Sequence, residues 1–434
     1  MQQPRTEETS LRAPLHPLND EADLDRLIEE IGDARVVMLG EASHGTHEYY
    51  TWRARISKRL IRERGFQFIA VEGDWPACYG LNRFVKHYAG SPEEVTEVLR
   101  EFGRWPTWMW ANWEIAGLGN WLRSFNADRS PEARVGFYGL DVYSLWESMN
   151  DIMTYLERED PEAAELAKQT ITCFEPYKND EKQYAWATRM VPESCEQEVV
   201  DLLRAILDRS QRYQTDVEDT FSTEQNARVA VNAERYYRSM VRSGPQSWNV
   251  RDRHMMQTLD RLLDFHEANS KAIVWEHNTH IGDARYTDMA HAGMVNIGQL
   301  AREAYGEAAV RLVGFGSYAG TVVAGQAWGA PPEVMDVPPA RENSWEAALH
   351  RAGSDRFYLL SSEFEGPAAH DTEVDHRAIG VVYDPAREAY GNYVPSRIGR
   401  RYDAFIHIDR TRALHPLDVT ANTHRVPETY PWNL

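Results

Sequence analysis

Residues 35–74 read RVVMLGEASHGTHEYYTWRARISKRLIRERGFQFIAVEGD, and this stretch decides the fold. It begins with a short apolar, β-branched run at 35–39, which predicts a buried strand. A helix-forming segment at 46–64 follows and ends before Gly65, a residue that is common just beyond helix C-termini. A second apolar run, 66–72, predicts the next strand. A strand, a helix and a strand in this order indicate a β-α-β unit, and therefore a parallel sheet.

Similar apolar runs recur along the chain and predict further buried strands. They lie at 135–140, 272–275, 311–315, 357–360, 379–383 and 405–408. A short amphipathic helix is predicted at 23–31, before the first strand. Between residues 145 and 270 the strand pattern disappears, and Glu, Ala, Leu, Arg and Gln dominate. We therefore predict an α/β fold, in which a central, mostly parallel sheet is flanked by helices and an all-helical insertion forms a second lobe over the cleft.

These patterns divide the chain into three predicted parts. Residues 1–20 are polar and interrupted by prolines, which predicts a flexible N-terminal arm. Residues 21–144 and 271–434 form the predicted α/β catalytic core, and residues 145–270 form the helical insertion lobe. The chain has 434 residues, which is long enough for one large α/β unit with such an insertion.

The composition narrows the expected partners and compartment. The formal charge of −20 repels phosphate backbones and anionic lipid, so neither nucleic acid nor a membrane is an expected partner. The N-terminus lacks the apolar run of a secretory signal, and no later stretch reaches membrane-spanning length. The three cysteines, Cys78, Cys173 and Cys195, lack CxxC spacing, so we expect neither a disulfide framework nor a zinc ribbon. We expect a cytoplasmic protein that is a monomer or a weak homo-oligomer.

The strongest chemical feature is LGEASHGTHE, residues 39–48, between the first predicted strand and its helix. Gly40 and Gly45 allow a tight turn, which leaves Glu41 and His44 near the helix N-terminus. The helix macrodipole disfavours imidazolium there, and a neutral imidazole is a competent general base. We therefore interpret His44 as a catalytic base with Glu41 beside it. The alternative is that His44 caps the helix or packs in the core.

A second acidic motif, VEGDWP at 71–76, lies where the next predicted strand ends. Consecutive strands in such sheets are usually neighbours, so Glu72 is predicted to join Glu41 in flanking His44. Two carboxylates would fix the tautomer of the imidazole and stabilise its charged form in the transition state. Alternatively, the acidic side chains of this motif belong to a structural ion network with arginines of the preceding helix, Arg53 or Arg55.

Two further histidines follow the predicted strand at 272–275, in the stretch IVWEHNTHIGDAR. His280 is predicted to protonate a leaving group or to orient water. His277 is either a substrate-binding residue or a core histidine. The aromatic stretch RWPTWMWANW, 104–113, forms either an apolar wall for a bulky ligand or simply core. The other predicted substrate-binding side chains are Arg53, Asp74, Trp105 and Trp108.

These motifs, in this order, resemble those of the erythromycin esterase-like family. The resemblance rests on GEASHG, VEGDWP and EHNTHIGD, and it continues through NAERYYRSM (232–240), WNVRDRHM (248–255) and GFGSYAGTVVAG (314–325). It implies an α/β core with a helical lobe over a wide cleft. It also implies a bacterial hydrolase of the kind that includes macrolide-resistance esterases, in which a histidine activates water against an ester or lactone without a metal or a covalent intermediate. Carried over, the resemblance makes His44 the base, and the supporting positions are Glu41, Glu72, Arg53, His277 and His280.

Other chemistries fit the same residues less well. A serine nucleophile at Ser43 lacks the G-x-S-x-G pattern, because Glu41 stands where the first glycine belongs. A metal-dependent hydrolase has enough ligand types but not H-E-x-x-H spacing; its candidate ligands are His44, His47, Glu48, Glu72, His277 and His280. A protein that binds a small molecule without hydrolysing it is the third alternative. The Gly-rich segment 314–320 lacks G-x-G-x-x-G and precedes another predicted strand, 321–324, so we expect no nucleotide cofactor.

Overall fold

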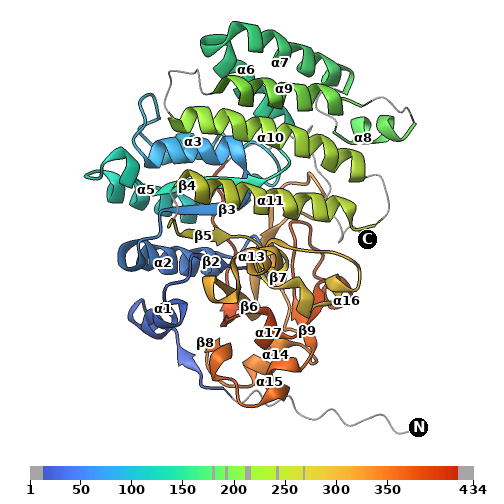
Figure 1. Cartoon of the computed structure of the whole chain (residues 1–434). Coiled ribbons are helices and arrows are strands. Elements are labelled where there is room, and N and C mark those ends of the chain that lie inside the picture. Colours follow the sequence, from blue (N-terminus) through green and yellow to red (C-terminus); the bar gives the residue numbers. More distant parts are fainter. Residues whose placement is uncertain are drawn as a thin grey trace. The chain divides into compact units, whose positions relative to one another are not determined.

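The computed structural model of the chain describes residues 13–177, 181–190, 194–210, 217–240, 244–266 and 269–418 (Figure 1). The chain forms two compact units. The first unit comprises residues 1–66 and 271–415, and the second unit comprises residues 67–270 and 416–434. The fold is α/β with mixed, mostly parallel strand pairing, as predicted.

The strands of the first unit form one mixed sheet and a separate antiparallel pair. They are β1 His16–Pro17, β2 Val36–Leu39, β5 Ala272–Trp275, β6 Val310–Ala324, β7 Glu333–Val337, β8 Arg356–Leu360, β9 Val374–Arg377, β10 Tyr393–Ser396 and β11 Ala404–Thr411. In the sheet, β11, β6, β2 and β5 are parallel neighbours in this order. Strand β8 pairs antiparallel with β11 and with β1, and β7 pairs antiparallel with β6. Strands β9 and β10 form the separate pair.

The helices of the first unit are mostly short. They are α1 Asp25–Ile31, α2 His47–Arg64, α12 Asn278–Ile281, α13 Ile297–Tyr305, α14 Trp345–His350, α15 Pro367–Asp371, α16 Glu388–Gly391 and α17 Ile398–Arg401. Helix α2 ends before Gly65, as the sequence predicts, and two basic residues in its last turn, Arg62 and Arg64, complement the helix dipole.

The centre of the first unit's sheet places two of the sequence motifs side by side. All four residues of β2, VVML, are buried, which suits a strand with neighbours on both sides. Leu39 at the end of β2 is in register with Trp275 at the end of β5. Because parallel strands end at the same edge, the segments 40–46 and 276–281 leave the sheet together. A hydrogen bond of 2.8 Å from the backbone N–H of Asn278 to the carbonyl of Glu41 joins them.

The second unit combines two parallel strands with many helices. The strands are β3 Phe68–Asp74 and β4 Gly136–Asp141. The helices are α3 Trp75–Val85, α4 Val95–Leu99, α5 Trp113–Asn126, α6 Leu145–Glu159, α7 Pro161–Phe174, α8 Glu181–Met190, α9 Glu196–Arg209, α10 Val217–Met240 and α11 Gln246–Phe265 (Figure 1). The strand-free stretch predicted for 145–270 is therefore helical. Among the helices that the structure describes, none has the length of apolar residues that a bilayer span needs.

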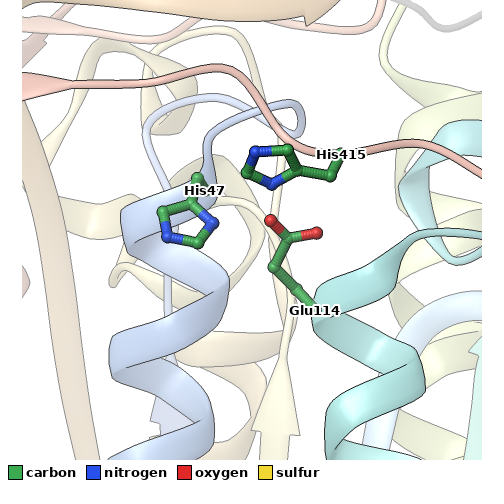
Figure 2. Close-up of side chains that lie close together, drawn as sticks. All are labelled: His47, Glu114 and His415. Atoms are coloured by element: carbon green, nitrogen blue, oxygen red, sulfur yellow. The ribbon is translucent and has the colours of Figure 1, made fainter.

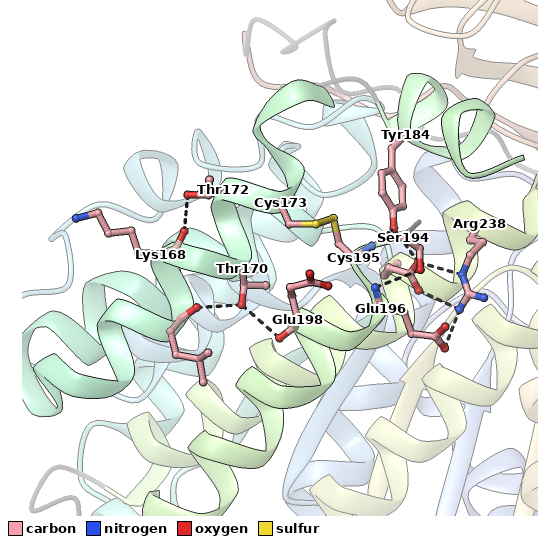
Figure 3. The surroundings of a disulfide bond; sticks show 12 residues. Lys168, Thr170, Thr172, Cys173, Tyr184, Ser194, Cys195, Glu196, Glu198 and Arg238 are labelled. Carbon is pink, nitrogen blue, oxygen red and sulfur yellow. Dashed lines mark hydrogen bonds and ion pairs between the residues drawn. A yellow bond between two sulfur atoms is a disulfide. The ribbon is translucent and has the colours of Figure 1, made fainter. Parts of the chain in front are cut away.

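The helices of the second unit carry a disulfide bond that the sequence analysis did not expect. Cys173 in α7 is bonded to Cys195, the residue before α9 (Figure 3). Beside it, the Tyr184 hydroxyl accepts from the backbone N–H of Cys195 at 3.0 Å and donates to Glu234 at 2.8 Å. The expectation of no disulfide framework is therefore wrong for this pair, because the fold of α7 to α9 decides which sulfur atoms meet. The cysteine pattern thus no longer supports the expected cytoplasmic location.

Two strand predictions and part of the predicted N-terminal arm differ from the structure. The segment 379–383 makes isolated bridges in place of a strand: Ile379 N–H donates to the carbonyl of Ala42 at 2.8 Å, and Tyr383 N–H donates to that of Gly325 at 3.0 Å. Its backbone bonds are thus divided between two loops. Residues 321–324 are not another strand but the end of β6. Part of the predicted flexible arm, 13–20, contains β1, while residues 1–12 lie outside the described part of the chain.

Candidate active site

The turn between β2 and α2, residues 40–46, carries the first candidate residues, and close backbone approach explains both of its glycines. A Cβ atom at Gly40 would overlap with Oδ1 of Asn278. A Cβ atom at Gly45 would overlap with the carbonyl oxygen of Val323 in β6. The turn is also tied to β6, because Val323 N–H donates to the carbonyl of Gly45 at 3.0 Å. This rigid turn holds the side chains of the motif in place.

Glu41 links His44 to Arg53 within the first unit. Its Oε1 is 2.9 Å from Nδ1 of His44, and its Oε2 accepts from Nη2 of Arg53 at 2.7 Å. Arg53 is fully buried in α2, with its guanidinium 4.3 Å from the ring centre of Tyr50 and 4.7 Å from that of Trp275. An ionised carboxylate can only accept, so Nδ1 of His44 carries the proton of the neutral ring. Nε2 of His44 is then the atom that can take up another proton.

His277 lies beside His44 and holds the opposite tautomer. The centres of the two rings are 5.0 Å apart and their planes are tilted by 44°. His277 caps α12: its Nδ1 accepts from the backbone N–H of Thr279 at 3.2 Å and is 2.8 Å from the hydroxyl of the same residue. Because this Nδ1 accepts, the neutral ring carries its proton on Nε2. Nε2 of His44 can therefore accept a proton, and the Nε2–H of His277 can donate a hydrogen bond.

The remaining histidine of the third motif, His280, lies in α12 and is buried. The helix is anchored through Asn278, whose Nδ2 donates to the carbonyl of Phe315 at 2.6 Å. Its backbone carbonyl accepts from Nη2 of Arg401 at 2.8 Å. Asn278 therefore positions this short helix against the turn that carries His44. The sequence analysis assigned no role to Asn278, although the residue stands between the two predicted histidines.

Two residues of the alternative chemistries are engaged elsewhere. The hydroxyl of Ser43 forms a hydrogen bond with that of Thr46. Glu48, a candidate metal ligand, accepts from the backbone N–H of Arg412 at 2.7 Å and from its Nε at 2.9 Å. The first contact gives Ser43 a structural role in the turn 40–46. The second gives Glu48 a structural role in the first turn of α2.

His47, another candidate metal ligand, packs against His415 of the same unit. The two ring centres are 5.2 Å apart and the planes meet at 86°, edge to face (Figure 2). Figure 2 also draws Glu114, which belongs to α5 of the second unit. Edge-to-face ring pairs contribute about 0.5–1.5 kcal/mol beyond their area burial. This packing contact is one interaction that holds His47 in place.

The second unit has its own buried charge cluster, in which Glu72 and Asp141 share one guanidinium. Nη2 of Arg251, in α11, is 2.7 Å from Oε1 of Glu72 and 2.6 Å from Oδ2 of Asp141. Nε of the same arginine donates to Oδ1 of Asp141 at 2.9 Å. All three residues are buried, and the guanidinium lies 4.8 Å from the ring centre of Tyr143. An arginine cannot lose its proton here, so the guanidinium at the centre of the cluster stays charged.

Asp74, at the end of β3, forms an ion pair with Arg104, whose Nε is 2.6 Å from Oδ2. Burial raises the pKa of Asp74 to about 7, although the guanidinium of Arg104 acts in the opposite direction. Asp74 therefore titrates near neutral pH, in contrast to the guanidinium of Arg251.

Most of the predicted aromatic wall lies in the interior of the second unit, but its last residue, Trp113, is 58% exposed. Trp105 and Trp108 are both 1% exposed. A neighbour that the sequence analysis did not single out, Trp110, donates from Nε1 to the backbone carbonyl of Glu72 at 3.0 Å. Trp110 therefore fixes the end of β3 at the residue that carries the acidic side chain.

The predicted site residues divide between the two units. Glu41, His44, Arg53 and His277 are together in the first unit, where the partner of Arg53 is Glu41. Glu72 and Asp74 lie in the second unit with Arg251 and Arg104 as their partners. That Glu72 flanks His44 stays a prediction.

Sequence reasoning missed Asp141 and Arg251. The sequence did contain a signal for them. Glu72 and Asp141 lie near the ends of two adjacent buried strands, and buried acidic residues require a cation. Arg251 also stands inside the motif WNVRDRHM.

The chain is similar over part of its length to two curated proteins. It is 27% identical to erythromycin esterase type II of Escherichia coli over 155 residues, which is 35% of each chain. It is 20% identical to the putative hydrolase YbfO of Bacillus subtilis (strain 168) over 278 residues, 60% of this chain and 59% of that protein. The matched regions thus span less than two thirds of either relative.

Solved structures show the same fold along nearly the whole chain. A succinoglycan biosynthesis protein matches with a TM-score of 0.76 and 21% identity, over 92% of this chain and 95% of that one. A protein from Bacillus cereus matches with a TM-score of 0.76 and 20% identity, over 93% and 97%. An erythromycin esterase mutant in its open conformation matches with a TM-score of 0.66 and 15% identity, over 91% and 95%. The family model of erythromycin esterase matches residues 61–411, and the chain therefore belongs to the erythromycin esterase family.

Proposed function

We propose that this chain is an esterase that cleaves an ester or lactone bond of a small molecule, with His44 as the base that activates water. The observation that carries the proposal is the position of Glu41, 2.9 Å from Nδ1 of His44 and 2.7 Å from Nη2 of Arg53. A carboxylate that holds the Nδ1 proton leaves Nε2 to act as the base and stabilises the imidazolium that forms. Family membership supports the choice of an ester as the substrate bond.

In the first step, Nε2 of His44 takes a proton from water, and the water oxygen attacks the carbonyl carbon of the ester. Negative charge then develops on the former carbonyl oxygen. The Nε2–H of His277 is suited to donate a hydrogen bond to that oxygen, because its Nδ1 is held as an acceptor by Thr279. This assigns His277 to the oxyanion and goes beyond its predicted role as a substrate contact.

In the second step, the tetrahedral intermediate collapses and the bond to the leaving oxygen breaks. That oxygen takes the proton from Nε2 of His44, so the ring returns to its neutral form. The products are a carboxylic acid and an alcohol, or one hydroxy acid if the substrate is a lactone. Arg53 contacts only protein groups in this scheme and acts by positioning Glu41.

The other predicted residues stay proposals. Glu72 and His280 are proposed catalytic residues, and Asp74, Trp105 and Trp108 are proposed substrate contacts. Because Arg251 pairs with Glu72, we assign Glu72 an electrostatic role in place of proton transfer.

The test begins with the purified full chain and a panel of esters and lactones, macrolides first, with product formation followed by chromatography. On a substrate that is cleaved, His44→Ala is compared with the matched variant His47→Ala. We expect His44→Ala to lower kcat by about 10²–10⁴-fold, the usual contribution of general acid–base catalysis. His47→Ala should retain activity, because its ring packs on His415.

Two results would contradict the mechanism. Unchanged turnover in His44→Ala, with an intact fold by circular dichroism, removes this residue as the base. Activity that is lost with EDTA and restored by a divalent metal replaces the scheme with metal-assisted hydrolysis. Failure on macrolides alone leaves the reaction class standing, since other esters and lactones belong to the panel.

A further inference from the structure

A pocket of about 410 Å³ lies among α9, α10 and α11 of the second unit. It uses none of the residues assigned to the proposed reaction. Its volume is at the small end of the range for ligand pockets, about 300–1,000 Å³. The polar side chains that matter for its chemistry are Gln225, Arg228 and Asn232 from α10 and His254, Thr258 and Arg261 from α11.

These polar residues form one stripe on each helix and meet across the pair. Residues three or four positions apart in an α-helix share a face, and both trios have this spacing. Gln225 donates from Nε2 to the hydroxyl of Thr258 at 2.8 Å and accepts from Nε of Arg261 at 3.1 Å. Nδ2 of Asn232 is 3.0 Å from Nδ1 of His254. The facing sides of α10 and α11 are thus joined by polar contacts around the pocket.

This polar face contrasts with the other side of α10. There, Ala227, Ala230, Ala233 and Tyr237 are buried in the apolar core that α10 shares with other helices of the unit. Helices in a bundle gain stability from apolar contacts between facing sides, and a polar stripe at that place gives up part of this gain. Polar side chains at positions where helix packing favours apolar ones concentrate at functional sites.

Two arginines and one aspartate line the pocket, and one of the arginines has a carboxylate partner. Arg261 donates to Glu224 at 3.0 Å. Nε of Arg228 is buried and has no hydrogen-bond partner among the described residues. Burial and the neighbouring charge of Arg261 lower the pKa of Arg228, whereas the carboxylate of Glu224 acts in the opposite direction. Asp260 also lines the pocket, but Arg228 keeps donor capacity that an incoming anion would use.

We propose that this pocket binds a small organic anion, with its carboxylate or phosphate group against Arg228 and its hydroxyl groups against the polar side chains around it. The planar guanidinium matches the paired oxygen atoms of a carboxylate or phosphate. The amide of Asn232, the ring of His254 and the amide of Gln257, which also lines the pocket, match hydroxyl groups, for which they provide both donors and acceptors. A sugar phosphate or a sugar acid combines these features in the available volume.

The test uses the full chain and isothermal titration calorimetry at physiological ionic strength, which suppresses non-specific charge binding. The probes are inorganic phosphate, a hexose 6-phosphate and gluconate, so that the phosphate and carboxylate groups are separated. We expect saturable binding of at least one probe with one site per chain. Arg228→Gln should weaken it by about tenfold or more, since a hydrogen bond to a charged group contributes about 1.5–3 kcal/mol and 1.4 kcal/mol corresponds to tenfold in affinity.

The matched control is Arg253→Gln, which removes an exposed arginine of α11 that does not line the pocket. It should bind as the unmodified chain does. Arg228→Lys, which keeps the charge but loses the planar pair of donors, should have intermediate affinity and serves if Arg228→Gln does not fold. Absence of saturable binding for all three probes would overturn the proposal. So would equal weakening in the Arg228 and Arg253 variants, which would indicate general charge attraction.

Discussion

The two units each hold a buried carboxylate–guanidinium pair, but the pairs differ in their third member. In the first unit Glu41 is shared by Arg53 and an imidazole, that of His44. In the second unit the guanidinium of Arg251 is shared by two carboxylates, those of Glu72 and Asp141. The first cluster thus contains a ring nitrogen that can take up a proton, whereas the second is centred on a guanidinium, which stays charged.

This difference indicates how similar ion pairs serve two purposes. A carboxylate anchored by arginine and bonded to histidine orients a base and supports its charged form. A guanidinium enclosed by two carboxylates is a structural charge whose removal leaves buried anions without a partner. Substitutions in each cluster test that contrast.

Replacing the shared carboxylate of the first cluster should have the largest effect. In Glu41→Gln the amide no longer selects the Nδ1-protonated ring of His44, and we expect kcat to fall by about 10³–10⁴-fold, within the range seen when such a carboxylate is replaced. The measurement is the steady-state rate on whichever ester the chain cleaves. Glu48→Gln is the control, because Glu48 contacts Arg412 and should leave kcat unchanged. Equal rates in both variants would assign Glu41 a structural role only.

Removing the shared cation of the second cluster should act mainly on stability. Arg251→Met leaves the carboxylates of Glu72 and Asp141 buried and unpaired, which should lower the free energy of unfolding by about 3–5 kcal/mol. Equilibrium unfolding in urea measures the change. The exposed Arg253→Met on the same helix should shift it by no more than about 0.5 kcal/mol. If both variants have the same stability, the cluster does not need its cation.

Removing the disulfide tests whether a loss of stability in the second unit also affects the turn 40–46 of the first unit. Replacing Cys173 and Cys195 by serine opens a cross-link between residues 22 positions apart, and we expect the free energy of unfolding to fall by about 3 kcal/mol. Hydrogen exchange followed by mass spectrometry should become faster in α7 and α9 and stay unchanged at 40–46. Faster exchange at 40–46 to the same extent would show that the two regions open together.

Asp74 gives the smallest effect and a pH signature. Its pKa is about 7 in the folded chain and near 3.9 when unfolded, so between these values the folded state binds the extra proton. Stability due to this proton is present at low pH and is lost as the pH rises towards 7, by at most about 1.4 kcal/mol per pH unit. Asp74→Asn should remove this slope in urea unfolding between pH 5 and pH 7, taken as approximate limits. Parallel curves for the two proteins would mean that Asp74 is ionised throughout.

Local sequence patterns predicted much of the fold because they depend on neighbours in the chain. The apolar run 272–275 coincides with β5, and the helix predicted at 46–64 corresponds to α2. The segment 379–383 has the same apolar character but is not a strand, because its backbone bonds go to two different loops. Periodicity reports whether a segment is buried and does not report which backbone it pairs with.

The same limit applies to the candidate site. Residue type and order are enough to predict that His44 and Glu41 occupy a glycine-bounded turn between a buried strand and a helix. The packed fold is needed to find that Arg53 completes the first cluster, that Thr279 sets the tautomer of His277, and that Arg251 is the partner of Glu72. Hydrogen bonds and ion pairs act over a few ångströms in space, so pairing between distant parts of the chain follows from the packed fold rather than from sequence spacing.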